Sequence, residues 1–159
     1  MTFEIRRDDL NGPEIQVLIR EHMAGMLSNS PLESVHALPL DGLRKPDITI
    51  WSVWRDDELC GCGALKELDI THGEIKSMRT KPQFVRMGVG QAVLNHIIQV
   101  AKARGYSRLS LETGSGEAFK PALALYQRSG FEFCDPFADY RSDPFSVFMT
   151  KTMPYPKKV

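Results

Sequence analysis

Two glycines lie between a strand-like segment and a helix-like segment near the middle of the chain. The strand pattern covers residues 74–80, and Gly88 and Gly90 stand where the apolar periodicity of a helix begins. Glycine lets a ligand approach the backbone closely, and the first N–H groups of a helix have no internal partner and carry partial positive charge. A strand, a glycine turn and a helix start therefore predict an anion site, usually for phosphate.

Two common phosphate-binding motifs fit this turn poorly. A P-loop requires Gly-Lys followed by Ser or Thr, and no such sequence follows Gly90. A dinucleotide fingerprint has an acidic residue roughly 20 positions on, which Glu112 could supply, but it also requires a third glycine where Val93 stands. The polar segment 81–87 also separates the strand from the first glycine. We therefore favour another type of phosphate ligand.

Two motifs, in this order, resemble the signatures of the GNAT superfamily of acetyltransferases. Residues 80–82 (Thr-Lys-Pro) and 88–90 (Gly-Val-Gly) resemble its acetyl-CoA-binding core. Residues 122–131, which contain Tyr126 and end in Gly-Phe, resemble the second signature, a tyrosine-bearing helix followed by Gly-Phe. The resemblance covers about residues 74–133.

The chain departs from the family pattern at two places. Val85 stands where the family usually has Gln or Arg, and Arg86 is displaced by one position. Residues 119–121 (Phe-Lys-Pro) occupy the region where the family usually has Asn, so an Asn contact to pantetheine is not expected. The family's pyrophosphate contact is mainly to backbone N–H groups, so the glycines matter more than the side chains.

The resemblance implies a fold and an activity. The fold would be α+β, with a mixed, mainly antiparallel sheet of about six or seven strands, a parallel βαβ unit at its centre and about four flanking helices. The activity would be direct transfer of an acetyl group from acetyl-CoA, as co-substrate, to an amine of a small molecule or amino-acid-like acceptor. Two alternatives stay open: a protein amine acetyltransferase, and a non-catalytic acyl-CoA-binding module. The rest of the chain looks like a branch of small bacterial acetyltransferases, and this likeness does not specify the acceptor.

The resemblance also assigns roles to residues of the two motifs. Tyr126 is the expected acid for the departing CoA thiolate, and Glu74 is the expected base, acting directly or through water. The family has a splayed strand near Met78, whose backbone N–H would polarise the thioester carbonyl. The residues expected to bind the cofactor are Met78, Arg79, Thr80, Val85, Arg86, Met87, Gly88, Val89, Gly90, Gln91 and Tyr126.

The acceptor pocket is predicted mainly from the N-terminal third of the chain. Parallel strands should part at their carboxyl ends where the cofactor enters, so the acceptor must approach from the other side of the thioester. The first helix and the loop after it are available to cover that side, and they contain histidines that no regular periodicity explains as core. Polar groups on an apolar wall are typical of small-molecule sites. The predicted pocket residues are His22, Ser34, His36, Glu112, Thr113 and Tyr140.

The periodicity of the chain predicts the elements that must position these residues. Strands are expected at 2–7, 48–54, 59–68, 74–80, 106–112, 131–134 and 146–153. Helices are expected at 13–27, with Asn11 as N-cap, then briefly at 38–43, and at 88–104 and 121–129. The strand at 74–80, the helix after it and the strand at 106–112 form the βαβ unit, so those two strands should be parallel.

Composition narrows the remaining possibilities. The 159 residues predict one domain, residues 1–159 with a core at about 3–153. Twenty basic and twenty acidic residues cancel, so neither nucleic acid nor a membrane is an expected partner; a homodimer is the assembly considered. No apolar run approaches the roughly 20 residues of a membrane span, and the start lacks a signal-peptide core, so a cytoplasmic location is expected. Cys60 and Cys62 should share one face of a strand as buried thiols, and no metal is expected.

Overall fold

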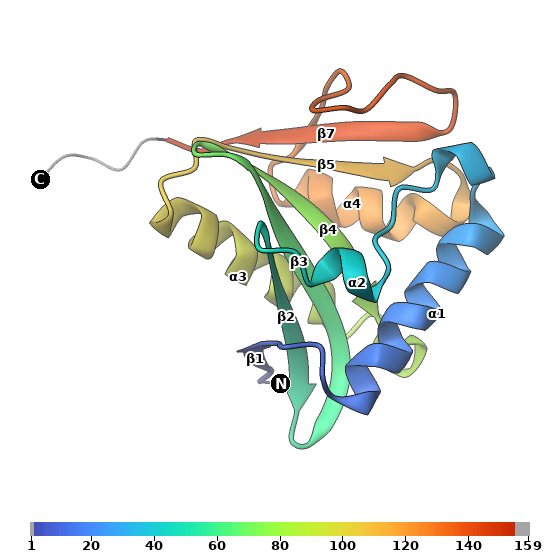
Figure 1. The fold of residues 1–159 in the computed structure, drawn as a ribbon, viewed down its shortest axis with the longest axis vertical. Coiled ribbons are helices and arrows are strands. Elements are labelled where there is room, and N and C mark those ends of the chain that lie inside the picture. The colour runs from blue at the N-terminus through green and yellow to red at the C-terminus, as the bar shows by residue number, and fades with distance from the viewer. Residues whose placement is uncertain (1, 155–159) are drawn as a thin grey trace, which may run out of the picture.

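The chain forms a seven-stranded sheet with helices on both faces, in a computed structural model that describes residues 2–154 (Figure 1). The strands are β1 (Glu4–Arg7), β2 (Ile48–Arg55), β3 (Glu58–Asp69), β4 (His72–Thr80), β5 (Arg108–Gly114), β6 (Glu132–Phe133) and β7 (Ser146–Thr152). The α-helices are α1 (Pro13–Asn29), α2 (Leu40–Leu43), α3 (Val89–Ala103) and α4 (Lys120–Arg128). Three short 3-10 turns are η1 (Leu32–Ser34), η2 (Pro82–Phe84) and η3 (Glu117–Phe119).

The sheet is mixed, and its only parallel pair within the described residues lies near its centre. The strand order is β1-β2-β3-β4-β5-β7-β6, and β4 pairs in parallel with β5. The other neighbouring strands are antiparallel. The predicted α+β class, the strand number and the parallel βαβ unit are therefore confirmed.

The crossover helix α3 follows from its sequence pattern. Its buried residues are Val89, Val93, Leu94, Ile97, Ile98 and Ala101. This spacing gives one apolar face that packs on the sheet. The helix begins after Gly88, whose φ is +90°, and the chain leaves it through Gly105, whose φ is +84°. Both positions are left-handed, which glycine adopts without a steric penalty.

Two hydrophobic clusters hold the helices against opposite faces of the sheet. The first contains residues of α3 and α4 together with Trp51. The second contains residues of α1 and α2, with Trp54 packed against it. The two tryptophans therefore point to opposite faces, as their spacing predicts. Figure 1 shows α1 and α2 on one side of the sheet and α3 and α4 on the other.

Two predictions about local structure were wrong. Asn11 is not the N-cap of α1; that position is Gly12, which makes no side-chain capping bond. The backbone N–H of Asn11 instead donates to Asp9 Oδ1, 3.0 Å away, in a turn where Leu10 has a φ of +65°. The helix itself begins at Pro13, as predicted.

Cys60 and Cys62 do not share one face of β3. Cys60 lies in the cluster with α3, and Cys62 lies in the cluster with α1. The β2–β3 register pairs Val53 with Gly61 and Trp54 with Leu59, which leaves Cys60 as an extra residue. Such a β-bulge interrupts the alternation of side chains, so the simple period of two fails here.

Candidate active site

The central parallel strands separate at the point where the two predicted motifs meet. The β4–β5 pairing ends at Ile75 and Leu111, although β5 continues to pair with β7 as far as Gly114. The backbone of β4 beyond this point therefore faces a gap. Extended backbone beside a gap leaves polar groups that a ligand can bind.

A bulge in β4 marks the same point. The β3–β4 register shifts so that Gly63 opposes both Ser77 and Met78, and Ser77 has a φ of +55°. A non-glycine residue in this conformation is uncommon and often lies at a functional site. The predicted splay near Met78 is thus present in the backbone.

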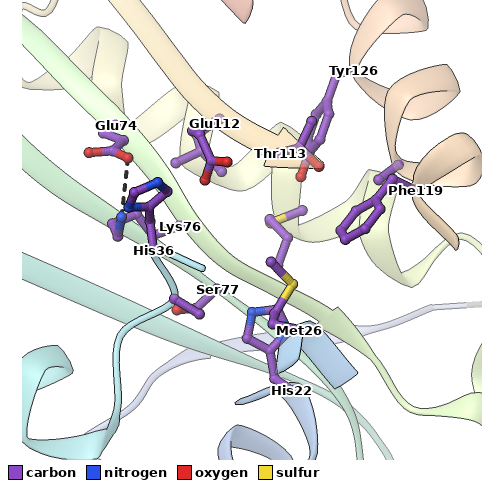
Figure 2. A pocket seen from close by; sticks show the side chains of 14 residues that line it. His22, Met26, His36, Glu74, Lys76, Ser77, Glu112, Thr113, Phe119 and Tyr126 are labelled. Carbon is purple, nitrogen blue, oxygen red and sulfur yellow. Dashed lines mark hydrogen bonds and ion pairs between the residues drawn. The ribbon is translucent and has the colours of Figure 1, made fainter. Parts of the chain in front are cut away.

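A cavity of about 110 Å³ lies at this splay, and we call it the inner cavity (Figure 2). It lies between the splayed strands, α1, the segment after η1, and α4. Its lining residues are His22, Met26, His36, Ala37, Glu74, Ile75, Lys76, Ser77, Met78, Glu112, Thr113, Phe119, Ala122 and Tyr126.

Glu74 lies on the wall of the inner cavity within a hydrogen-bonded network. One oxygen, Oε2, is 3.2 Å from Lys76 Nζ and accepts a hydrogen bond from the Tyr140 hydroxyl at 2.5 Å. Lys76 also donates to the Tyr140 oxygen at 2.9 Å. The Glu74 and Lys76 side chains are only 3% and 9% exposed, so this ion pair is largely shielded from water. Removing either member would leave an unpaired buried charge.

Glu112 lines the inner cavity in a different environment. It is the first β5 residue beyond the last pair with β4, and Figure 2 shows its carboxyl group in the same cavity as Glu74 and Tyr126. Burial raises the pKa of the Glu112 carboxyl to about 7, while the Lys76 charge lowers it and the Glu74 charge raises it. A carboxyl group with this pKa can exchange a proton near neutral pH.

Tyr126 lies on α4 at another wall of the cavity. It is 6% exposed, and its ring packs edge-on against Phe131 at 5.9 Å between centroids. Among the described residues its hydroxyl has no hydrogen-bond partner. Burial raises the pKa of Tyr126, so the hydroxyl stays protonated and can donate. The two signature motifs thus bring Tyr126 and the β4 splay into one cavity.

The predicted phosphate turn lies between β4 and α3. Arg86 and Gly88 both have positive φ, at +64° and +90°, and a side chain at Gly88 would meet nothing within 4 Å. The open space beside this backbone, directly before α3, fits a phosphate group. Gly90 lies closer to other atoms, because an added Cβ would be 3.1 Å from Leu125. The side chain of Gln91 is occupied, since it donates to Asn95 and to Ser129.

The other predicted cofactor residues differ in exposure. Val85 and Arg86 are exposed, whereas Val89, the first residue of α3, is buried in the hydrophobic cluster between α3 and the sheet. Met87 packs against the same core. Arg79 and Thr80 lie at the end of β4, and the Arg79 Nε atom is buried without a partner. The turn therefore offers backbone groups, with Arg86 as its exposed charge.

Two of the predicted N-terminal residues line the inner cavity. His22 from α1 and His36 after η1 both lie on its wall. Burial, with a smaller contribution from the Arg79 charge, lowers the pKa of His22 to about 4, so this ring is neutral at pH 7. His22 Nδ1 and Ser77 Oγ are buried without hydrogen-bond partners, and both residues belong to the cavity lining. A ligand with polar groups would satisfy them.

Ser34 and Tyr140 are not among the residues that line the inner cavity. Ser34 Oγ donates to Asp143 Oδ1 at 3.1 Å, and His36 packs edge-on against Tyr140 with centroids 5.0 Å apart. Asp143 also accepts from two backbone N–H groups, and these bonds hold its pKa at about 2. These contacts join the segment after α1 to the loop between β6 and β7.

A second cavity of about 500 Å³ lies beside the first, and we call it the outer cavity. His36 and Glu74 line both cavities. The residues that line the outer cavity are Glu33, His36, Lys66, Leu68, Glu74, Ala138, Asp139, Tyr140, Arg141, Ser142 and Asp143.

Sequence reasoning missed several members of the site. Lys76 follows Glu74 by two positions in a strand, and this spacing could have placed both on one face. Lys66 is paired with Glu74 across the β3–β4 ladder, which required the register. Met26 lies at helical spacing on the apolar face of the first helix, and Phe119 stands where the family usually has Asn, so neither was expected in the site. No cluster of histidine, cysteine or acidic residues that could hold a metal ion is found among the described residues. No helix within 2–154 is long and apolar enough to cross a membrane.

Comparisons with known proteins agree with this geometry. A family model described as the acetyltransferase (GNAT) family matches residues 15–131. The chain is similar to an uncharacterized N-acetyltransferase of Bacillus subtilis (strain 168), YsnE, with 58% identity over 94% of this chain and 99% of that protein. It is similar to an uncharacterized N-acetyltransferase of Escherichia coli (strain K12), YedL, with 52% identity over 95% of each chain. A crystal structure of a putative acyl-CoA N-acyltransferase from Klebsiella pneumoniae superposes with a TM-score of 0.77 at 28% identity, covering 95% of this chain and 97% of that one.

Proposed function

Because this chain belongs to the GNAT acetyltransferase family and is an acetyl-CoA-dependent N-acetyltransferase, we propose that it transfers the acetyl group directly to an amine of a small molecule. The observation that supports a small acceptor is that two segments are joined beside the cavities. The Ser34–Asp143 hydrogen bond and the His36–Tyr140 contact connect the segment after α1 to the loop between β6 and β7. A protein substrate requires an open groove for an extended chain, and these contacts would obstruct one.

Acetyl-CoA would bind along the splayed half of β4. The N–H groups at the start of α3, beside Gly88, would bind the pyrophosphate, and the exposed Arg86 adds a positive charge there. The thioester would then lie beside the Ser77 bulge, with a backbone N–H near Met78 as donor to its carbonyl oxygen. A donor aimed at developing negative charge contributes about 3–4 kcal/mol to catalysis.

The acceptor amine must lose a proton before it attacks, because a free alkyl amine has a pKa of about 10. We propose Glu112 as the group that takes this proton, with Glu74 as the alternative predicted from the sequence. Glu74 already binds Lys76 and Tyr140 through one oxygen, which leaves it less able to accept a proton. The pKa of Glu112, about 7, suits a base that works near neutral pH.

Tyr126 completes the proton balance. The neutral amine forms a C–N bond with the carbonyl carbon, and the C–S bond breaks to release the CoA thiolate. The nitrogen then loses its second proton to solvent, so each transfer releases one proton overall. The Tyr126 hydroxyl then gives its proton to the sulfur, and the proton held by Glu112 returns through solvent to restore Tyr126. Holding acyl donor and amine together in one cavity also contributes, because positioning lowers the entropic cost of a bimolecular step.

Initial-rate assays test the proposed function. Purified protein with acetyl-CoA would be given a panel of small amines and, separately, peptides with free N-terminal and lysine amines. We expect CoA release and a mass increase of one acetyl group for at least one small amine, with slower turnover of every peptide. Faster acetylation of a peptide than of any small amine would overturn the small-molecule assignment.

A further inference from the structure

A half-buried lysine in the outer cavity has no ion-pair partner among the described residues. Lys66 lies on β3 directly opposite Glu74 in the β3–β4 ladder. Side chains at directly paired positions share one face of a sheet. The Glu74 carboxylate is already paired with Lys76, however, and accepts the Tyr140 hydroxyl as well. Glu74 therefore has two lysines as neighbours on the sheet, and only Lys76 is paired with it.

No other carboxylate that lines the two cavities forms an ion pair with Lys66. Asp143 is ionised, and its Oδ1 accepts hydrogen bonds from Ser34 and two backbone N–H groups. Glu112 carries only part of a negative charge at pH 7, because its pKa is about 7. Glu33 and Asp139 are exposed, as Arg141 is, and neither forms an ion pair with Lys66.

Arg141 adds a second cation to the outer cavity. It belongs to the loop between β6 and β7 and is exposed. No ion pair joins it to another residue within 2–154. Its guanidinium group suits a carboxylate because its paired N–H donors match the two carboxylate oxygens. Lys66 from the sheet and Arg141 from the loop thus offer two unpaired cations in one cavity.

We propose that the acceptor carries a carboxylate as well as its amine, and that Lys66 and Arg141 bind this carboxylate in the outer cavity. The inference rests on the proposed function, because it assigns the end of the acceptor that does not react. The inner cavity, at about 110 Å³, has room for little more than the amine end of a ligand. The outer cavity, at about 500 Å³, is within the range of small-molecule sites and would hold the rest. Glu74 and His36 line both cavities, so the two ends of one acceptor would lie in neighbouring cavities.

Matched pairs of amines test this assignment. Each pair consists of an amino acid and the same amine without its carboxylate, for example phenylalanine with phenethylamine, and ω-amino acids of two to six carbons with alkylamines of equal length. The kcat/KM ratio within a pair isolates the contribution of the carboxylate. We expect the best pair to favour the carboxylated member by about 10-fold or more in the wild type, since a hydrogen bond to a charged group typically contributes that much.

Variants then locate the carboxylate. Lys66→Gln should reduce this ratio to about 1–2, Lys66→Arg should restore part of it, and Arg141→Gln should reduce it in the same direction. Lys102→Gln is the matched control, because Lys102 is exposed on α3, which covers the opposite face of the sheet. It should leave the ratio unchanged. Thermal unfolding of each variant shows whether the fold is intact.

Two results would overturn the inference. One is a ratio that stays high in a folded Lys66→Gln variant; the other is a preference for uncarboxylated amines or diamines over every amino acid. If no amine of any kind is acetylated, the proposed function fails separately. In that case, calorimetry measures how tightly the same amino acids bind to the wild type and to Lys66→Gln with CoA present, and this tests the carboxylate site on its own. Binding that Lys66→Gln abolishes would support the site, and binding that the substitution does not change would refute it.

Discussion

Glu74 and Glu112 lie in the same inner cavity but have different surroundings. Glu74 is bound to Lys76 and Tyr140 and is almost fully buried. Burial without such a direct ion pair raises the pKa of Glu112 to about 7. Residue type alone could not assign the base, because both positions hold the same amino acid. The difference comes from which neighbour each carboxylate meets.

The pH dependence of catalysis should separate the two carboxylates. In the wild type, kcat/KM should rise as the pH rises through about 7, because the base acts only when it has lost its proton. Glu112→Gln should lower kcat/KM roughly 100-fold, the lower end of a typical acid–base contribution, and remove this rise. Glu74→Gln should keep the rise but lower the melting temperature, because it leaves Lys76 buried without its partner. A rise that disappears in Glu74→Gln and persists in Glu112→Gln would make Glu74 the base.

Tyr126 can be tested as the acid by removing one oxygen atom. Tyr126→Phe keeps the ring that packs on Phe131 and removes the proton donor. We expect kcat to fall at least 10-fold while the KM for acetyl-CoA changes little, because the lost interaction develops as the thiolate forms. Initial rates at saturating acceptor measure this. Wild-type turnover in the variant would leave Tyr126 with a packing role alone.

At the scale of elements, the glycine turn before α3 has a matched counterpart after it. Gly88 and Gly105 have φ values of +90° and +84°, and an added side chain would meet nothing within 4 Å at either position. Gly88→Ala and Gly105→Ala should therefore lower the free energy of unfolding by similar amounts, roughly 1–2 kcal/mol for a residue in the left-handed conformation. Only Gly88→Ala should weaken CoA binding, because only Gly88 lies at the phosphate end of α3. Calorimetry with CoA measures the affinity, and equal Kd values for the two variants would contradict a phosphate site at this turn.

The elements themselves could be predicted because their patterns are local. The spacing of apolar residues gave α3, and the glycines gave its ends. The failures arose where backbone irregularities change the pattern. The bulge at Cys60 reverses the alternation in β3, and the turn at Leu10 leaves Gly12 rather than Asn11 as the N-cap of α1. Neither irregularity is indicated by the residue types at these positions.

The candidate site depends on contacts that no local pattern contains. Lys76 meets Tyr140, which lies 64 positions later, and Ser34 meets Asp143, which lies 109 positions later. The sequence placed His22 and His36 near the β4 splay, and both line the inner cavity; that this cavity binds the acceptor stays a prediction. Their neighbours required the fold. The roles of all these residues stay predictions until variants are measured.

For the molecule as a whole, His22 and Glu112 in the inner cavity should make opposite contributions to the pH dependence of the free energy of unfolding. The pKa of His22 falls from 6.5 to about 4 on folding, so the unfolded chain binds more protons and stability increases with pH between these values. The pKa of Glu112 rises from 4.5 to about 7, so the folded chain binds more protons and stability decreases with pH across that window. Between pH 5 and 7 each contributes a change of about 2 kcal/mol, of opposite sign.

Removing either residue should expose the contribution of the other. The free energy of unfolding can be measured by urea denaturation at pH 5 and pH 7. The contributions of His22 and Glu112 to its change between these pH values should cancel in the wild type but not in a variant that lacks one of them. Relative to the wild type, His22→Gln should lose about 2 kcal/mol on going from pH 5 to pH 7, because only the Glu112 term remains. Glu112→Gln should gain about 2 kcal/mol over the same interval, because only the His22 term remains. The double variant should return to the wild-type trend, since the two terms cancel. If both single variants follow the wild-type trend, burial does not shift the pKa of either His22 or Glu112 in the folded protein. The assignment of Glu112 as the base would then lose its physical basis.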